Sequence, residues 1–129
     1  MIEEQIFSIL TADSGLSAIV DSRIYPMSIP QEGRTPCIVY QKITGPRLYD
    51  HGGESGLAYP RFQFSCWANS YSGAKALADA LRSAFSAYSD RSATVPVHVA
   101  FIEAELDDYE PETKLYRRIM DFRVWHEES

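Results

Sequence analysis

Several features that would point to common classes of function are missing from this sequence. It has no run of about 18 apolar residues, the length that a membrane-spanning helix needs. Its first residues, Met1-Ile2-Glu3-Glu4, are acidic where a secretory signal is basic. We therefore expect no membrane association and a protein that stays in the cytoplasm where it is made.

Positive charge is also scarce. Twelve Lys and Arg residues face 18 Asp and Glu residues, which gives a formal net charge of −6. Binding to nucleic acid in general needs clustered basic side chains that neutralise phosphates, so we expect no specific nucleic-acid binding. The acids are concentrated in one run of ten residues without a base, which contains Glu103, Glu105, Asp107, Asp108, Glu110 and Glu112. This run predicts a solvated turn between two strands, with a functional negative patch or a cation site as alternatives.

The residues that usually make metal or catalytic centres are few and scattered. Cys37 and Cys66 have no second Cys or His at ligand spacing, and their apolar surroundings favour two buried thiols over a disulfide. His51, His98 and His126 form no metal-binding motif, and we expect the last two at the surface or at a sheet edge. No phosphate-binding motif occurs, and Gly-Glu-Ser-Gly at 53–56 matches a nucleophile elbow only loosely. The sequence therefore predicts no enzyme, no metal and no cofactor.

The spacing of apolar residues predicts one α+β domain over residues 1–129. Apolar residues recur at helical spacing near the N-terminus and again in the middle of the chain, whereas β-branched and aromatic runs lie between and after them. The expected elements are helix 2–12, a helical turn at 16–20, strand 37–44, loop 45–57, strand 58–68, helix 71–88, and strands 97–106 and 115–126. Short connections favour one four-stranded, mainly antiparallel sheet, with the N-terminal helix and the long central helix on one face.

Because both predicted helices lie on one face of the predicted sheet, the other face has no cover within the chain. Residues 61–67 and 115–125 alternate between apolar side chains and a second set that is rich in Arg and Trp. Such side chains are enriched where proteins meet. The predicted interface consists of Arg61, Gln63, Trp67, Arg117, Asp121, Arg123 and Trp125. Two alternatives stay open: the arginine stems simply cover the sheet, or the face is the floor of a small ligand-binding or regulatory domain.

Four stretches of the chain resemble a known family. They read "IFSILTADSGLSAIVDSRIYP", "PCIVYQKITG", "FQFSCWANSYSGAKALADALRSAF" and "YEPETKLYRRIMDFRVW". In order and with little gap, they are similar to the small tail-completion proteins of long-tailed bacteriophages and prophages, also described as head–tail joining or tail terminator-like proteins. The turn at 109–113 and the residues after it are the most specific part.

The resemblance implies a structural protein of the virion. It would form a homo-oligomeric ring, a hexamer, at the head-proximal end of the tail tube, in contact with the tail-tube protein and the head connector. The family has no catalytic motif. Two hypotheses follow for the variable regions. The loop Gly45–Ala58, with Arg47, Tyr49, His51 and Glu54, is mobile in the free subunit and orders on assembly. Part of the acidic run, Asp107, Asp108 and Glu110, lines the channel and repels passing DNA.

Overall fold

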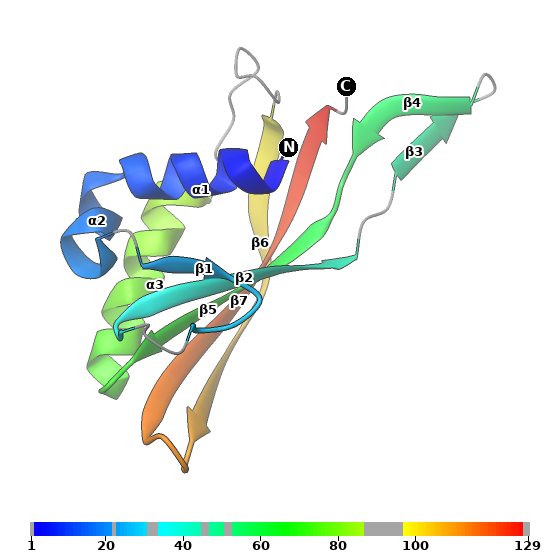
Figure 1. Cartoon of the computed structure of the whole chain (residues 1–129). Coiled ribbons are helices and arrows are strands. Elements are labelled where there is room, and N and C mark those ends of the chain that lie inside the picture. Colours follow the sequence, from blue (N-terminus) through cyan, green and yellow to red (C-terminus); the bar gives the residue numbers. More distant parts are fainter. Residues whose placement is uncertain are drawn as a thin grey trace.

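The computed structural model describes residues 2–21, 23–30, 34–44, 47–50, 53–86 and 97–127, and for 44, 47–50 and 53–57 it describes the backbone alone. Within these ranges, three helices and seven strands follow one another along the chain. Figure 1 shows their arrangement. They are α1 Ile2–Ala12, α2 Ser14–Val20, β1 Ile24–Pro26, β2 Cys37–Thr44, β3 Arg47–Asp50, β4 Gly53–Ala58, β5 Arg61–Ala68, α3 Tyr71–Phe85, β6 Val97–Glu110 and β7 Leu115–Glu127. The α+β class predicted from the sequence is confirmed.

Side-chain caps begin two of the helices. Asp13 accepts a hydrogen bond from the backbone N–H of Leu16 at 2.9 Å and thereby starts α2. Ser70 caps α3 in the same way, accepting from the N–H of Gly73 at 3.0 Å. A β-carbon at Gly73 would lie 2.9 Å from the Ser70 hydroxyl, so the absence of a side chain there leaves room for the cap. The end of the helix predicted over 71–88 falls partly outside the described residues, and α3 itself ends at Phe85.

The described residues form a sheet of seven strands, so the prediction of four is wrong. Its order is β1-β2-β5-β7-β4-β3, and β6 pairs with the other edge of β7. The difference comes mainly from the stretch 45–57, which was predicted as a loop and contains β3 and most of β4. There β3 continues the course of β2, and β4 leads into β5, so that the pairing β2–β5 is prolonged as β3–β4. Figure 1 shows β3 and β4 as a hairpin that extends away from the helices.

All three helices lie on one face of the sheet, as predicted for the first and last of them (Figure 1). Alternate residues of the central strands point toward these helices. Phe64 and Phe122 are edge-to-face, with ring centroids 5.4 Å apart, and Phe85 of α3 lies 5.2 Å from Phe122. All three rings are fully buried. Burial of apolar surface is the dominant favourable contribution to folding, and the buried cluster of helix and strand residues on this side of the sheet is the core of the molecule.

The strand β6 is longer than predicted and contains a bulge. It runs to Glu110, so most of the acidic run is strand, and the turn occupies only residues 111–114. The prediction of an acidic turn is wrong to this extent. Between Ile102, opposite Phe122, and Ala104, opposite Asp121, the strand holds one extra residue, Glu103. Such a bulge shifts the alternation of faces by one position, which decides where each following acid points.

Both cysteines and the last histidine, His126, are buried. Cys37 and Cys66 are buried and free, and they belong to neighbouring strands but to different cross-strand pairs, Cys37 with Trp67 and Ile38 with Cys66. Burial raises the pKa of the Cys37 thiol to about 11 and also raises that of Cys66. His126 is 4% exposed, between β4 and β6, so its expected surface position is wrong; His98 contacts Glu127 at 3.0 Å.

Candidate assembly surface

The predicted interface residues lie on the sheet face opposite the helices. Their cross-strand register is direct: Arg61 is opposite Arg123, Gln63 opposite Asp121, and Trp67 opposite Arg117. Side chains directly opposite each other on one face of an antiparallel pair are in contact distance. We call these residues together with Trp125 the outer face. The residues that alternate with the apolar set in the sequence therefore share one face of the sheet.

Two aromatic contacts organise the outer face. The guanidinium carbon of Arg117 lies 4.9 Å from the centre of the Trp67 ring. At the other end, Trp125 stacks on Tyr59, with centroids 4.5 Å apart and ring planes 14° from parallel. Arg123 donates to the carbonyl oxygen of Tyr59 at 2.9 Å and so fixes the chain between β4 and β5. These contacts hold the large side chains in place before any partner binds, which reduces the entropy lost on association.

The centre of the outer face contains a buried charge. Asp121 is 5% exposed, and its carboxylate accepts a hydrogen bond from Arg61. That hydrogen bond raises the pKa of the Arg61 guanidinium. Among the described residues, Oδ1 of Asp121 and Nε of Arg61 and Arg117 are buried without a hydrogen-bond partner. The face therefore retains polar groups whose hydrogen-bonding capacity is not used up within the chain.

A shallow depression of about 270 Å³ lies on this face beside Trp67. It is lined by strand residues that include Val39, Ser65 and Arg117, by the segment 27–29 after β1, and by residues of the stretch 110–115. The chain's own segments thus border the outer face, while the helices cover only the opposite one. Met27 is 69% exposed at this border. The outer face therefore contains a depression that its own side chains do not fill.

Strand alternation sends the neighbouring acids Asp107 and Asp108 to opposite faces of the sheet, and the bulge decides which face each one takes. Asp108 pairs with Arg117 at the outer face, and the hydrogen bond from Arg117 together with the Tyr109 backbone N–H holds the pKa of Asp108 below its ordinary value of 3.8. Asp107 points the other way, toward α3, where it accepts from Arg118 at 2.5 Å. Glu110 accepts a hydrogen bond from Thr113 within the turn. The three residues of the predicted acidic patch are therefore not one continuous surface.

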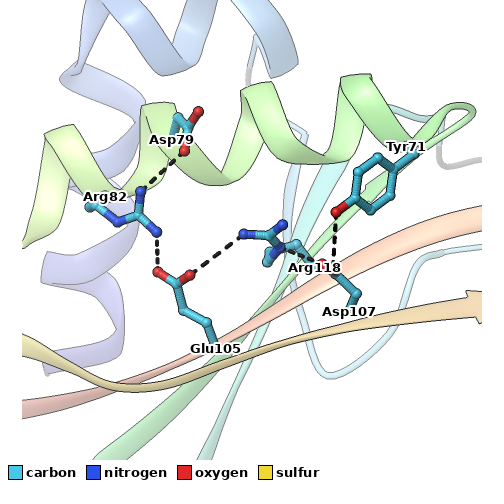
Figure 2. Close-up of polar contacts among 6 residues, drawn as sticks. All are labelled: Tyr71, Asp79, Arg82, Glu105, Asp107 and Arg118. Carbon is cyan, nitrogen blue, oxygen red and sulfur yellow. Dashed lines mark hydrogen bonds and ion pairs between the residues drawn. The ribbon is translucent and has the colours of Figure 1, made fainter.

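Figure 2 shows the contacts that Glu105 and Asp107 make on the face of the sheet that the helices cover. Glu105 accepts from Arg82 of α3 and lies 3.5 Å from Arg118. Asp107 accepts a second hydrogen bond, from the Tyr71 hydroxyl at 3.2 Å. Since Arg82 and Tyr71 belong to α3, this network ties the β6–β7 hairpin to the helix layer and orients the hairpin relative to the body.

The predicted assembly loop is a pair of strands. Arg47 and Glu54 lie on β3 and β4, with Arg47 opposite Ala58 and Tyr49 opposite Glu54. The structure describes the backbone of these residues and not their side chains, and His51 lies outside the described residues. Whether the segment is mobile before assembly stays a prediction.

Sequence reasoning missed two residues of the outer face. Tyr59 lies in a connection between strands, and its position before Pro60 was the one signal of an extended conformation there. Glu103 pairs with Arg123 at 2.5 Å because the bulge turns it to the outer face. A bulge leaves no trace in hydrophobic alternation when its residues are polar, so the pairing was not visible in the sequence.

Neither a metal site nor a membrane helix occurs in the described ranges. No group of three or more His, Cys, Asp or Glu side chains there could hold a metal ion. No described helix has the length and apolar character to cross a membrane. What the residues build is a contact surface made of aromatic rings, arginines and a depression.

The fold and this surface define an α+β protein with a sheet that is covered by helices on one side. The family model of tail completion protein gp17 matches residues 4–127, and the chain belongs to that family of virion structural proteins. No curated protein matches the chain. A solved structure entitled "Virion of native gene transfer agent (GTA) particle" contains a chain of the same fold, with a TM-score of 0.79. The likeness covers 95% of this chain and 91% of that one at 18% sequence identity.

Proposed function

We propose that this protein completes the virion tail as a hexameric ring at the head-proximal end of the tail tube. Membership of the tail completion family supports a structural role in the tail. The observation that carries the proposal is the outer face, which the helices leave uncovered and which presents Trp67, Trp125 and several arginines. A ring needs a heterologous contact, in which one patch meets a different patch of the next subunit.

The partners follow from this position. One copy contacts its neighbours in the ring, and the ring contacts the tail-tube protein on one side and the head connector on the other. The outer face supplies one of these contacts, and residues 1–129 act as a single domain. The protein is made in the host cytoplasm and functions at the head–tail interface. No catalytic step, metal or cofactor belongs to this role.

Tail morphology tests the proposal. Tails made without this protein should have uncontrolled length or fail to join heads, as seen by negative-stain microscopy. Complementation with Trp67→Ala or Arg117→Ala should restore assembly poorly, because both lose the contact at 4.9 Å on the outer face. Lys75→Ala, at an exposed position of α3, is the matched control and should restore it fully. Normal tails from the deletion strain would overturn the proposal.

The channel hypothesis now concerns two of the three acids that the sequence indicated. We propose that Asp108 and Glu110 face the channel, whereas Asp107 contacts Arg118 and serves the fold. Carboxylates along a channel repel DNA and keep it from adhering. Replacing Asp108 and Glu110 by Lys should slow DNA ejection, while Glu4→Lys on α1 should not. Equal ejection rates for both variants would remove the hypothesis.

A second candidate function rests on the depression beside Trp67. Its volume of about 270 Å³ lies just under the range of roughly 300–1,000 Å³ typical of small-molecule pockets. A small ligand-binding domain would use Trp67 as a stacking surface and Gln63 as a hydrogen-bonding group. Screening by Trp fluorescence against a fragment collection tests this candidate. Quenching that Trp67→Phe abolishes would support it, and the absence of any quenching would exclude it.

A further inference from the structure

The strand β6 presents a long hydrogen-bonding edge. Its 14 residues pair on one side with β7, and no other strand of the described residues pairs with it. Unpaired backbone groups along such an edge form a template on which another strand can add. This edge is much longer than the edge of β1, a strand of three residues at the opposite end of the sheet. The question is which strand fits.

The register identifies the outward-facing backbone groups of β6. Val124 donates its N–H to Pro60, on the β5 side of β7, at 3.0 Å. Backbone groups of successive residues in a strand point to alternate edges, so odd-numbered residues of β7 face β6. Leu106, opposite Ile119, therefore bonds inward. The residues of β6 with outward N–H and C=O groups are Ala100, Ile102, Glu105, Asp107 and Tyr109.

One hydrogen bond agrees independently with this assignment. The N–H of Tyr109 is taken by the carboxylate of Asp108 at 2.9 Å, which is possible only if it points away from β7. The same bond ends the available edge near the turn. The part of the edge that can accept a strand thus runs from Ala100 to Asp107.

The charge of β6 opposes pairing with a second β6. The strand contains five acids, Glu103, Glu105, Asp107, Asp108 and Glu110, and no Lys or Arg. Two copies side by side would place carboxylates opposite carboxylates, which destabilises a strand pair. A strand that is neutral or basic fits better.

The other free edge of the same sheet has that character. The outer edge of β2 is occupied near its start, where Arg23 accepts from Ile38 and Met27 donates to Tyr40. Beyond Tyr40, no strand of the described residues pairs with this edge. Lys42 is the next residue whose backbone faces it, and β3 continues the edge with Arg47. This second edge therefore contains two basic residues of the sequence, of which Lys42 is 42% exposed and contacts Glu3 at 3.1 Å.

We propose that β6 of one copy pairs with the β2–β3 edge of a second copy. The inference rests on the proposed function, because it specifies how neighbouring subunits of the ring join. Two different edges of one sheet meet, so the contact is heterologous, and two joined subunits together keep one free edge of each kind. Such contacts continue from copy to copy until the ring closes.

Matched proline and alanine variants test each edge. Glu105→Pro removes an outward N–H of β6, whereas Glu105→Ala loses the same contacts with Arg82 and Arg118 and keeps the N–H. Lys42→Pro and Lys42→Ala form the corresponding pair for β2, since both lose the contact with Glu3. Self-association is measured by sedimentation velocity up to millimolar concentration. Each proline variant should associate about tenfold or more weakly than its alanine partner.

Mixing the two proline variants distinguishes the geometry. Glu105→Pro keeps an intact β2–β3 edge and Lys42→Pro keeps an intact β6 edge, so a one-to-one mixture should form dimers and no larger species. Dimers of Lys42→Pro alone would show pairing between two β6 strands and overturn the proposal. Wild-type protein that stays monomeric at millimolar concentration, or proline variants that associate like their alanine partners, would also overturn it.

Folding and function are controlled separately. Circular dichroism establishes that each proline variant is folded, and Asp107→Pro with Asp107→Ala is the second pair if Glu105→Pro is not. The proposed function fails if tails are normal without the protein, which no variant is needed to observe. The edge inference fails on its own if tails require the protein while the proline variants complement as well as the alanine variants.

Discussion

Two substitutions on opposite faces of the sheet should have very different effects on stability. Phe122 is fully buried between Phe64 and Phe85, at centroid distances of 5.4 and 5.2 Å. Phe122→Ala removes these contacts and leaves a cavity, which costs about 3–5 kcal/mol. Since a domain of this size has about 5–15 kcal/mol of stability in total, the variant should be marginally folded.

On the outer face, Trp67 is half-buried and contacts Arg117 at 4.9 Å. Loss of a cation–π contact at an exposed site costs about 0.5–1 kcal/mol, and the apolar surface that Trp67 shares with its neighbours adds a similar amount. We expect Trp67→Ala to lower the free energy of unfolding by about 1–2 kcal/mol, less than half the effect at Phe122.

Thermal and urea unfolding of the isolated protein provide the measurement. At roughly 3–5 °C per kcal/mol, Phe122→Ala should lower Tm by about 10–20 °C and Trp67→Ala by about 3–10 °C. Phe122→Leu is the control, because it retains most of the buried volume. An equal loss for Phe122→Ala and Trp67→Ala would refute the reasoning, since it would make the outer face a second core and not a surface for a partner.

Two further predictions concern the bulge and the thiols. Deletion of Glu103 removes the extra residue of β6 and leaves the flanking pairs in register, so the protein should fold with Tm nearly unchanged. Deletion of Glu105 keeps that register only if Glu103 and Ala104 each move one position, which turns them to the opposite faces and loses the contacts of Glu105 with Arg82 and Arg118, so it should lower Tm. Similar melting curves for the two deletions would contradict this. Cys37 and Cys66 should resist alkylation in the native protein at pH 8, because burial raises both pKa values above 9.0. The unfolded thiols ionise first, so stability should fall as pH rises from about 9 toward 11, and rapid native labelling at pH 8 would exclude this account.

Much of the fold could be predicted from local patterns. The apolar stripe of α3 and the alternation in β5 and β7 each specify a buried face, because side chains repeat with the period of the element that carries them. The cap of α2 follows a local rule as well, since Asp13 accepts from a backbone N–H only three positions further along the chain. The outer face followed from these local rules as the set of residues left over.

The hairpin β3–β4 could not be predicted in this way. The stretch 45–57 contains Gly45, Pro46 and several further glycines, which usually indicate a loop. The pairing Tyr49–Glu54 extends a ladder that begins at Cys37 and Trp67, so the neighbouring strands supply an order that the local composition opposes. Tertiary context overrode propensity.

The sequence by itself determined the class of the fold, the two faces of the central strands and membership of a tail completion family. Only the tertiary structure decided how the acids are used. One extra residue at Glu103 turns Asp107 toward Arg118 and the helices and Asp108 toward Arg117 and the outer face. The reason is that face alternation is counted along a strand, whereas a bulge depends on how two strands distant in sequence align.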